Sequence, residues 1–175
     1  MKNKFLRTLC ILLCGVCILS CAACNFSDDI PNSTSSDVTE TEPVIITELN
    51  QSYNGSILKI TATDIKAIHD SGTDNIIVGV KFIVENVSNN DFYLSGKNTS
   101  AYVDDVTTSE NGGYLFDASG KELGGNIAPG KRSEGYRSVC CSRNAKVVEF
   151  SFEESYNLSQ NVFFAFDLSA IEITN

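Results

Sequence analysis

Residues 76–85 read Ile-Ile-Val-Gly-Val-Lys-Phe-Ile-Val-Glu, and their pattern decides the fold class. Every second position carries a large apolar residue: Val78, Val80, Phe82 and Val84. The positions between them carry Gly79, Lys81 and Glu85, with Ile83 as the apolar exception. Side chains of a strand alternate between two faces, so this period of two predicts a strand with one buried face. We expect the strand to end at the polar turn of residues 86–91.

The preceding segment, residues 56–68, predicts a second strand. Three apolar residues are in phase there: Leu58, Ile60 and Ala62. The phase then slips before Ile65 and Ala67, which indicates a β-bulge near residues 63–64, where one extra residue enters the strand.

Further strands are predicted at residues 101–106, 114–116, 135–142, 147–152 and 162–168. Turn-forming residues separate them at 117–121, 124–126 and 128–131. No segment after residue 43 has a helical apolar stripe. About seven or eight short strands with such turns are typical of an all-β fold. We therefore predict one domain, residues 44–175, with the architecture of an immunoglobulin-like antiparallel β-sandwich.

Three segments carry a more specific pattern. The strand predicted from residues 76–85 ends in Glu85-Asn86 before a polar turn. Residues 117–121 form an Asp-x-x-Gly-Lys turn, and Pro129-Gly130 leads to Gly135 and a further strand. Residues 58–152 thereby resemble the immunoglobulin-like extracellular lipoprotein domain of Gram-positive bacteria. That group is mostly of unknown function and is related in fold to a secreted mycobacterial immunoprotective antigen. The resemblance implies a fold and a location, and it supplies no catalytic residues.

The chain departs from this family at one point. A proline usually ends the strand after the Pro-Gly turn, whereas residues 140–143 here read Cys-Cys-Ser-Arg, which leaves the end of that strand open.

Residues 1–24 have the composition of a secretory signal. A basic head carries Lys2, Lys4 and Arg7, an apolar run covers residues 9–19, and small residues and cysteines follow at 20–24. The end of this segment resembles the lipobox of bacterial lipoproteins, with Cys21 as the acylated residue and Cys24 as the alternative. An ordinary cleaved signal is the competing interpretation. Diacylation, for example with palmitate, supplies the two chains that stable anchoring needs. We therefore expect the protein on the extracytoplasmic face of the bacterial cell membrane.

Residues 25–43 differ sharply in composition from the rest. They contain five acidic residues, two prolines and no basic residue. A segment with so few large apolar side chains cannot offset its chain entropy by burial, so it predicts a disordered tether. Its reach is on the order of 25 Å.

The charge of the chain excludes some partners. Removal of residues 1–20 takes away three positive charges and moves the formal charge from −9 to −12. Nucleic acid requires clustered Lys and Arg, so we expect no nucleic-acid partner. The expected partners are the membrane, through the N-terminal anchor, and an unknown protein or envelope component.

Five of the seven cysteines lie in the first 24 residues, so a disulfide framework is not expected in the domain. Cys140 and Cys141 remain, and neighbouring strand residues point to opposite faces. We predict two free thiols, one buried and one facing outward, with a vicinal redox pair as the alternative.

Acidic residues are candidates for a catalytic carboxyl pair or for a calcium site. The pairs at 104–105 and 153–154 diverge on a strand, which disfavours the facing carboxyls of a glycosidase. Asp104, Asp105 and Asp117 are weak calcium candidates, because calcium takes six to eight oxygens in flexible geometry. No spaced calcium loop is present, and solvated loop acids are the favoured interpretation. His69 is expected to be a solvated turn residue, which leaves a zinc site without ligands.

Four tyrosines form the last candidate surface: Tyr93, Tyr102, Tyr114 and Tyr136. They suit either an exposed aromatic face or, as we favour, ordinary sheet positions with solvated hydroxyls. No cofactor, metal or catalytic residue is predicted, so we expect a protein that is not an enzyme. The leading hypothesis is a non-catalytic binding or interaction module at the cell surface. The alternative is a small-ligand or calcium-binding accessory lipoprotein of an envelope enzyme or transporter, and a hydrolase with an acidic site is the third.

Overall fold

The strand predicted from residues 76–85 lies at the centre of the larger of two packed sheets. The computed structural model describes residues 42–111, 116, 123–155 and 158–174. In it, β4 (Asn75–Asn86) pairs antiparallel with β3 (Leu58–His69) on one side and with β10 (Arg132–Ser142) on the other. The register of β3 and β4 shifts between Ala62 and Asp64, which confirms the predicted bulge.

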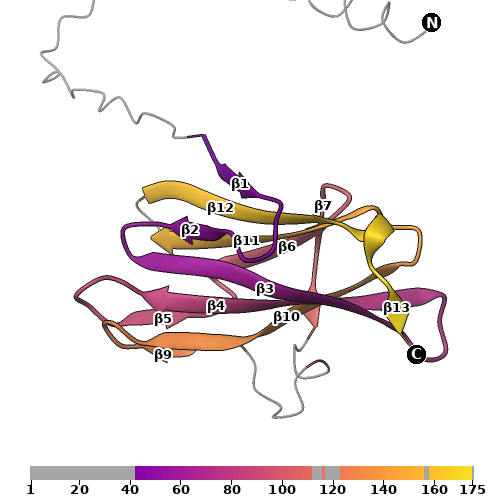
Figure 1. The fold of residues 1–175 in the computed structure, drawn as a ribbon, viewed down its shortest axis with the longest axis horizontal. Helices are drawn as coiled ribbons and strands as arrows, with labels where there is room; N and C mark the ends of the chain where they lie inside the picture. Colours follow the sequence, from indigo (N-terminus) through magenta and orange to yellow (C-terminus); the bar gives the residue numbers. More distant parts are fainter. Residues whose placement is uncertain (1–41, 112–115, 117–122, 156–157, 175) are drawn as a thin grey trace, which may run out of the picture. The chain divides into compact units, whose positions relative to one another are not determined.

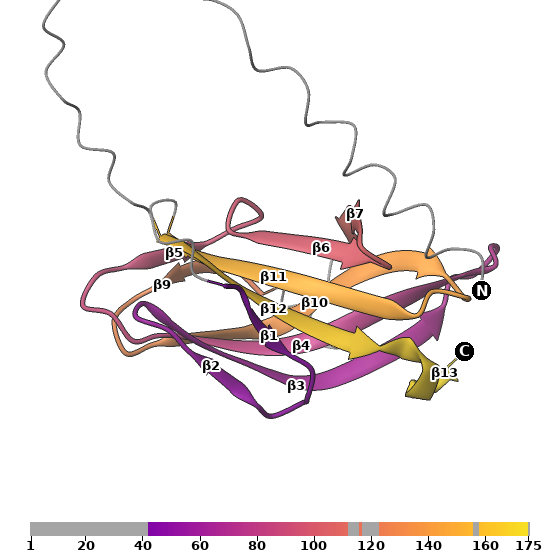
Figure 2. The ribbon, with the colours of Figure 1, turned by 90° about the horizontal axis from the view of Figure 1, so that it is seen from above.

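The two sheets form two layers (Figures 1 and 2). The larger sheet has the order β13 (Ile173–Thr174), β3, β4, β10 and β8 (Glu110–Asn111), with β2 (Ser52–Asn54) also pairing with β3. The smaller has the order β1 (Val44–Ile46), β12 (Leu158–Asp167), β11 (Val147–Ser155), β6 (Thr99–Val103) and β7 (Val106–Thr108). A separate ribbon pairs β5 (Phe92–Leu94) with β9 (Gly125–Ile127), and a short 3-10 turn, η2 (Leu168–Ala170), follows β12.

The all-β sandwich is therefore confirmed, but three details of the prediction are wrong. The described residues contain 13 strands instead of seven or eight, because edge strands of two or three residues are too short to show periodicity. Two edge pairs, β1 with β12 and β13 with β3, are parallel. Residues 101–106 are not one strand, since β6 turns back into β7 at residues 104–105. The strand predicted at 114–116 and the turn at 117–121 lie largely outside the described residues.

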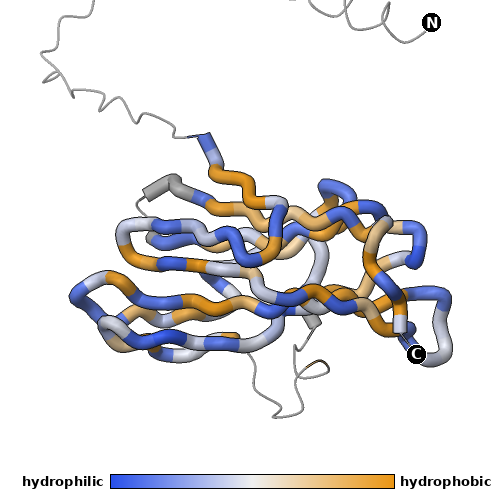
Figure 3. Tube along the Cα trace, viewed as in Figure 1, coloured by the Kyte–Doolittle hydropathy of each residue, from blue (hydrophilic) through white to orange (hydrophobic). Residues whose placement is uncertain are grey.

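The core is built around Phe82 of β4. Its ring makes edge-on contacts with three phenylalanines of the facing sheet, at centroid distances of 5.7, 4.9 and 5.3 Å from Phe150, Phe152 and Phe164 respectively. Edge-to-face pairs of this kind add to the stabilisation by burial. Apolar and polar residues alternate along these strands (Figure 3), as the period of two predicts.

Asn86 fixes one end of the sandwich. Its side-chain amide is fully buried and donates to the carbonyls of Asn90 and Ile127, while its Oδ1 accepts from the backbone and hydroxyl of Ser88. The carbonyl of Asn86 also accepts from the backbone N–H of Gly130, whose φ of 67° matches the positive value expected for the Pro-Gly turn. One asparagine thus joins two of the three segments that carried the family resemblance.

Candidate functional site

The structure places two of the three predicted calcium candidates, Asp104 and Asp105, in one turn. Asp104 and Asp105 are the two central residues of the β6–β7 turn, with φ of 49° and 68°. Oδ1 of Asp104 accepts the backbone N–H groups of Lys146 and Val147, at 2.9 and 3.0 Å. These bonds lower the pKa of Asp104 and tie the turn to β11. Asp117 lies outside the described residues, and the described residues hold no group of three metal-ligating side chains.

The cysteines of the domain behave as predicted. Both are free thiols, and Cys141 is buried whereas Cys140 is only half-buried. Burial, followed by the proximity of Cys140 and Asp104, raises the pKa of the Cys141 thiol to about 11. Burial and Asp70 also raise the pKa of Cys140. Neither group has the lowered pKa of a reactive thiol. Cys21 and Cys24 lie outside the described residues.

The single histidine is the last residue of β3, where it pairs with Ile76 and is half-buried, so the prediction of a turn position is wrong.

The described tyrosines do not form one aromatic face. Tyr93 of β5 is 67% exposed, whereas Tyr102 of β6 packs against Phe163. Tyr136 of β10 is buried, and its hydroxyl donates to Asp64 at 2.6 Å, so the solvated hydroxyl expected there is not found. Tyr114 lies outside the described residues.

Tyr136 belongs to a polar cluster on the larger sheet. Its hydroxyl donates to Asp64, and Lys66 pairs with the same carboxylate at 3.2 Å while lying over the tyrosine ring. Burial raises the pKa of Asp64, but the bonds from Tyr136 and Lys66 outweigh it and leave that pKa below its usual value. The ring of Phe116 stacks on Tyr136 in the space that Gly79 leaves free of a side chain. The polar groups of this cluster bond to one another, so we interpret the cluster as part of the structure and not as a binding site.

Glu154 was missed as a special residue by the sequence analysis. It is only 2% exposed, and its carboxylate accepts the backbone N–H groups of Ser56, Ile57 and Leu58 as well as the Ser56 hydroxyl. A carboxylate with this many donors is a satisfied buried acid. A Cβ on Gly55 would lie 1.9 Å from its Oε1, so the bend that closes over Glu154 requires glycine at this position.

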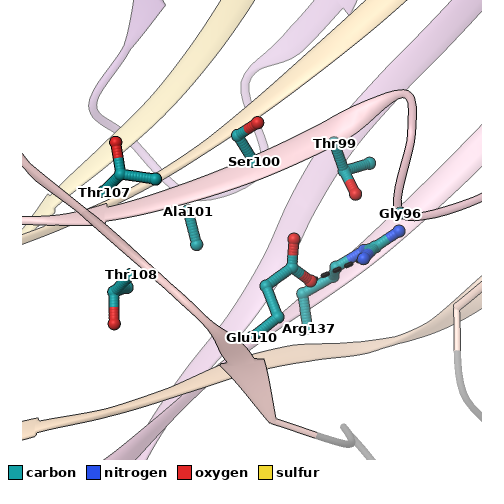
Figure 4. A pocket seen from close by; sticks show the side chains of 8 residues that line it. All are labelled: Gly96, Thr99, Ser100, Ala101, Thr107, Thr108, Glu110 and Arg137. Carbon is teal, nitrogen blue, oxygen red and sulfur yellow. Dashed lines mark hydrogen bonds and ion pairs between the residues drawn. The ribbon is translucent and has the colours of Figure 1, made fainter.

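A pocket of about 250 Å³ lies between the edges of the two sheets, where the chain crosses from β7 to β8 (Figure 4). Its lining comes from β6, β7, β8, β10 and the turn before β6: Gly96, Thr99, Ser100, Ala101, Thr107, Thr108, Glu110 and Arg137. No motif or spacing in the sequence predicts a site at these residues. The pocket exists because β6–β7 belongs to one sheet and β8 to the other, so the layers part at this edge.

An ion pair lines the pocket. Arg137 stands opposite the buried Val80, and Glu110 stands opposite the buried Val139, so both side chains point into the sandwich. Nη1 of Arg137 donates to Oε2 of Glu110 at 2.5 Å (Figure 4). The two side chains are only 11% and 19% exposed. A pair this well shielded from water is screened little by salt.

One N–H donor of Arg137 has no hydrogen-bond partner. Nε of Arg137 is buried and has no hydrogen-bond partner, and it is the one such side-chain atom in the described part of the chain. Buried donors in folded proteins are nearly always paired, and an unpaired one costs about 1–3 kcal/mol. The pocket is thus lined by a fixed charge pair and lies beside a buried donor for which the described residues provide no acceptor.

The described lining offers charged and polar groups that can hold a ligand. The lining contributes one carboxylate, one guanidinium and threonine and serine hydroxyls, without a histidine, cysteine or second carboxylate.

No family model and no curated protein matches the sequence. Among solved structures, this one is similar to ycdA, a candidate lipoprotein of Bacillus subtilis, with a TM-score of 0.56 and 21% sequence identity. The match covers 69% of this chain and 39% of ycdA, so the chain spans well under half the length of that protein. The yjhA protein of Bacillus subtilis gives a TM-score of 0.53 at 9% identity, over 70% of this chain and 100% of yjhA. Identities this low show a shared fold alone.

Within residues 42–111, 116, 123–155 and 158–174, no helix is long and apolar enough to cross a membrane.

Proposed function

We propose that the chain is a non-catalytic binding module, held by a lipid anchor on the outer face of a bacterial cell membrane. In this proposal Cys21 carries the lipid, residues 25–43 act as a spacer, and the β-sandwich presents its binding site beyond the lipid headgroups. The resemblance of residues 58–152 to the Gram-positive lipoprotein domain supports this location, and so does the likeness of the fold to the candidate lipoprotein ycdA.

The pocket at Arg137 is the observation that carries the binding role. Its charge pair is fixed by a short bond and by burial, and Nε of Arg137 lacks a partner. A site of this kind is organised before a ligand arrives, so little ordering entropy is lost on binding. The one carboxylate of the described lining is already engaged by Arg137, which favours holding a ligand over transforming it.

The same pocket favours the small-ligand form of the accessory-lipoprotein hypothesis as a second function. An envelope enzyme or transporter would then use this chain to collect or retain its substrate. The calcium form has weaker support, because Oδ1 of Asp104 already accepts two backbone N–H groups.

A glutamate-specific protease added to intact protoplasts tests the location. The proposed spacer has no Lys or Arg, but it contains Glu40 and Glu42. We expect release of a folded fragment that begins at Thr41, and no release from the Glu40→Gln, Glu42→Gln double variant. A domain that becomes accessible only after the protoplasts are lysed would contradict the proposal.

The non-catalytic role has its own test. Compounds that bind the purified chain are incubated with it overnight and recovered for mass spectrometry. We expect every bound compound to return with its mass unchanged, whereas a converted product would show that the chain is an enzyme.

A further inference from the structure

We propose that the pocket at the β7–β8 crossing binds a small zwitterion, with an ammonium and a carboxylate on neighbouring atoms as in an α-amino acid. The carboxylate accepts the hydrogen bond of Arg137 Nε, and the ammonium donates to the Glu110 carboxylate. This inference rests on the proposed binding role and names the ligand class of that site.

The unpaired Nε of Arg137 is the group that would recognise the carboxylate of the ligand. Glu110 occupies Nη1 of Arg137, and Nε faces a different edge of the guanidinium without a partner. Guanidinium groups bind carboxylates strongly because both planes present matching donors and acceptors. A ligand oxygen at Nε would satisfy the buried donor that the fold leaves open.

Charge balance explains why the ligand should also carry an ammonium group. A free anion would meet Glu110 within the pocket and an acidic chain around it, since the formal charge of the protein is −9. A free cation would meet Arg137 in the same way. A ligand that carries both charges meets an opposite charge at each end, so the ion pair stays intact and only the zwitterion has both of its charges matched.

The size and lining of the pocket fit the same class. About 250 Å³ accommodates a molecule of amino-acid size. Ala101 and Gly96 give the pocket an apolar and uncrowded side, and Thr108 contributes a hydroxyl (Figure 4). No aromatic ring is among the described lining residues, so a stacked sugar or base is not favoured.

Calorimetric titration of the full-length chain in detergent with three matched probes tests the proposal. L-alanine carries both charges, propionate lacks the ammonium, and ethylamine lacks the carboxylate. We expect saturable binding of L-alanine with a dissociation constant of about 1 mM or tighter, and binding of propionate and ethylamine at least about tenfold weaker. Equal affinity for propionate would overturn the proposal in favour of an anion site, and the absence of L-alanine binding would overturn it outright.

Variants locate the binding. Arg137→Gln and Glu110→Gln should each weaken L-alanine binding at least about tenfold. Arg132→Gln is the matched control, because Arg132 is an exposed arginine on the same strand and should bind as the wild type does. Thr108→Phe keeps the ion pair and fills the pocket, so it should abolish binding while circular dichroism remains unchanged. Unaltered affinity in Arg137→Gln or Thr108→Phe would show that the pocket is not the site.

Failure of this inference is distinguishable from failure of the proposed function. Protease release from protoplasts and recovery of unchanged ligands do not depend on which compound the pocket holds.

Discussion

Glu154 is the side chain whose charge the fold depends on most directly. Three backbone N–H groups and one hydroxyl donate to its buried carboxylate. Glu154→Gln keeps the shape, but its NH2 group faces donors instead of accepting from them. We expect the free energy of unfolding to fall by about 2–4 kcal/mol, measured by urea denaturation.

Glu153→Gln is the matched control for this change, because Glu153 is adjacent and half-buried. It should alter the free energy of unfolding by less than about 0.5 kcal/mol. Equal effects of the two substitutions would contradict the role given to Glu154.

Cys141 gives the domain a sensitivity to alkaline pH. The folded state raises the pKa of this thiol from 9.0 to about 11, so folding favours the neutral thiol. The resulting stabilisation is complete below pH 9 and is lost as the pH rises through 11. We expect the melting temperature of wild type to fall over this interval more steeply than that of Cys141→Val. Parallel curves for the two proteins would refute the assignment.

Three buried polar residues whose roles were not predicted share one signal in the sequence. Asn86, Arg137 and Glu154 each lie two residues from a core residue of their own strand, and thus on its buried face; these core residues are Val84, Val139 and Phe152 respectively. A polar residue in the apolar phase must find a buried partner, and each of these does so. The phase could be read from the sequence, whereas the identity of the partner depends on tertiary pairing, as with Ser56 and Glu154.

Among the elements, the β6–β7 hairpin shows how a local turn fixes a strand pair. Its two central residues have positive φ, and the expected pair for such a turn ends in glycine. Asp105→Gly should therefore raise the melting temperature by about 2–4 °C. A lower melting temperature would show that the Asp105 side chain stabilises the turn.

Asp104→Asn should have the opposite effect, because the carboxylate accepts two backbone N–H groups of the β11 start. Folding lowers the pKa of Asp104, so its contribution is present above the unfolded pKa of about 4 and is lost as the pH falls through the lowered folded value. We expect Asp104→Asn to melt about 2–4 °C below wild type at pH 7, and this difference to shrink as the pH falls below about 4. A difference that stays constant on acidification would contradict the electrostatic cause.

Long strands were predictable and short ones were not. Residues 76–85 and 147–152 carry enough alternating positions to reveal a period of two, and β4 and β11 confirm them. Edge strands such as β1 and β13 have two or three residues, and their parallel pairing is set by where distant segments arrive. The pocket was unpredictable for the same reason, since it requires β7 and β8 to lie in different sheets.

For the molecule as a whole, Phe82 is the residue that joins the two layers. Its ring contacts three phenylalanines of the facing sheet, so Phe82→Ala leaves a cavity at their centre. The expected loss is about 3–5 kcal/mol in the free energy of unfolding, against about 1 kcal/mol for Ile83→Ala, which is half-buried on the other face. Similar losses at both positions would mean that the layers do not pack through Phe82.

The central claim is that this β-sandwich works outside the cell on an acylated cysteine, and the intact mass of the protein extracted from membranes tests it most directly. The account predicts a chain of residues 21–175 carrying the added mass of two acyl chains. A membrane-extracted protein that keeps residues 1–20, or one that begins at residue 21 without lipid, would contradict it.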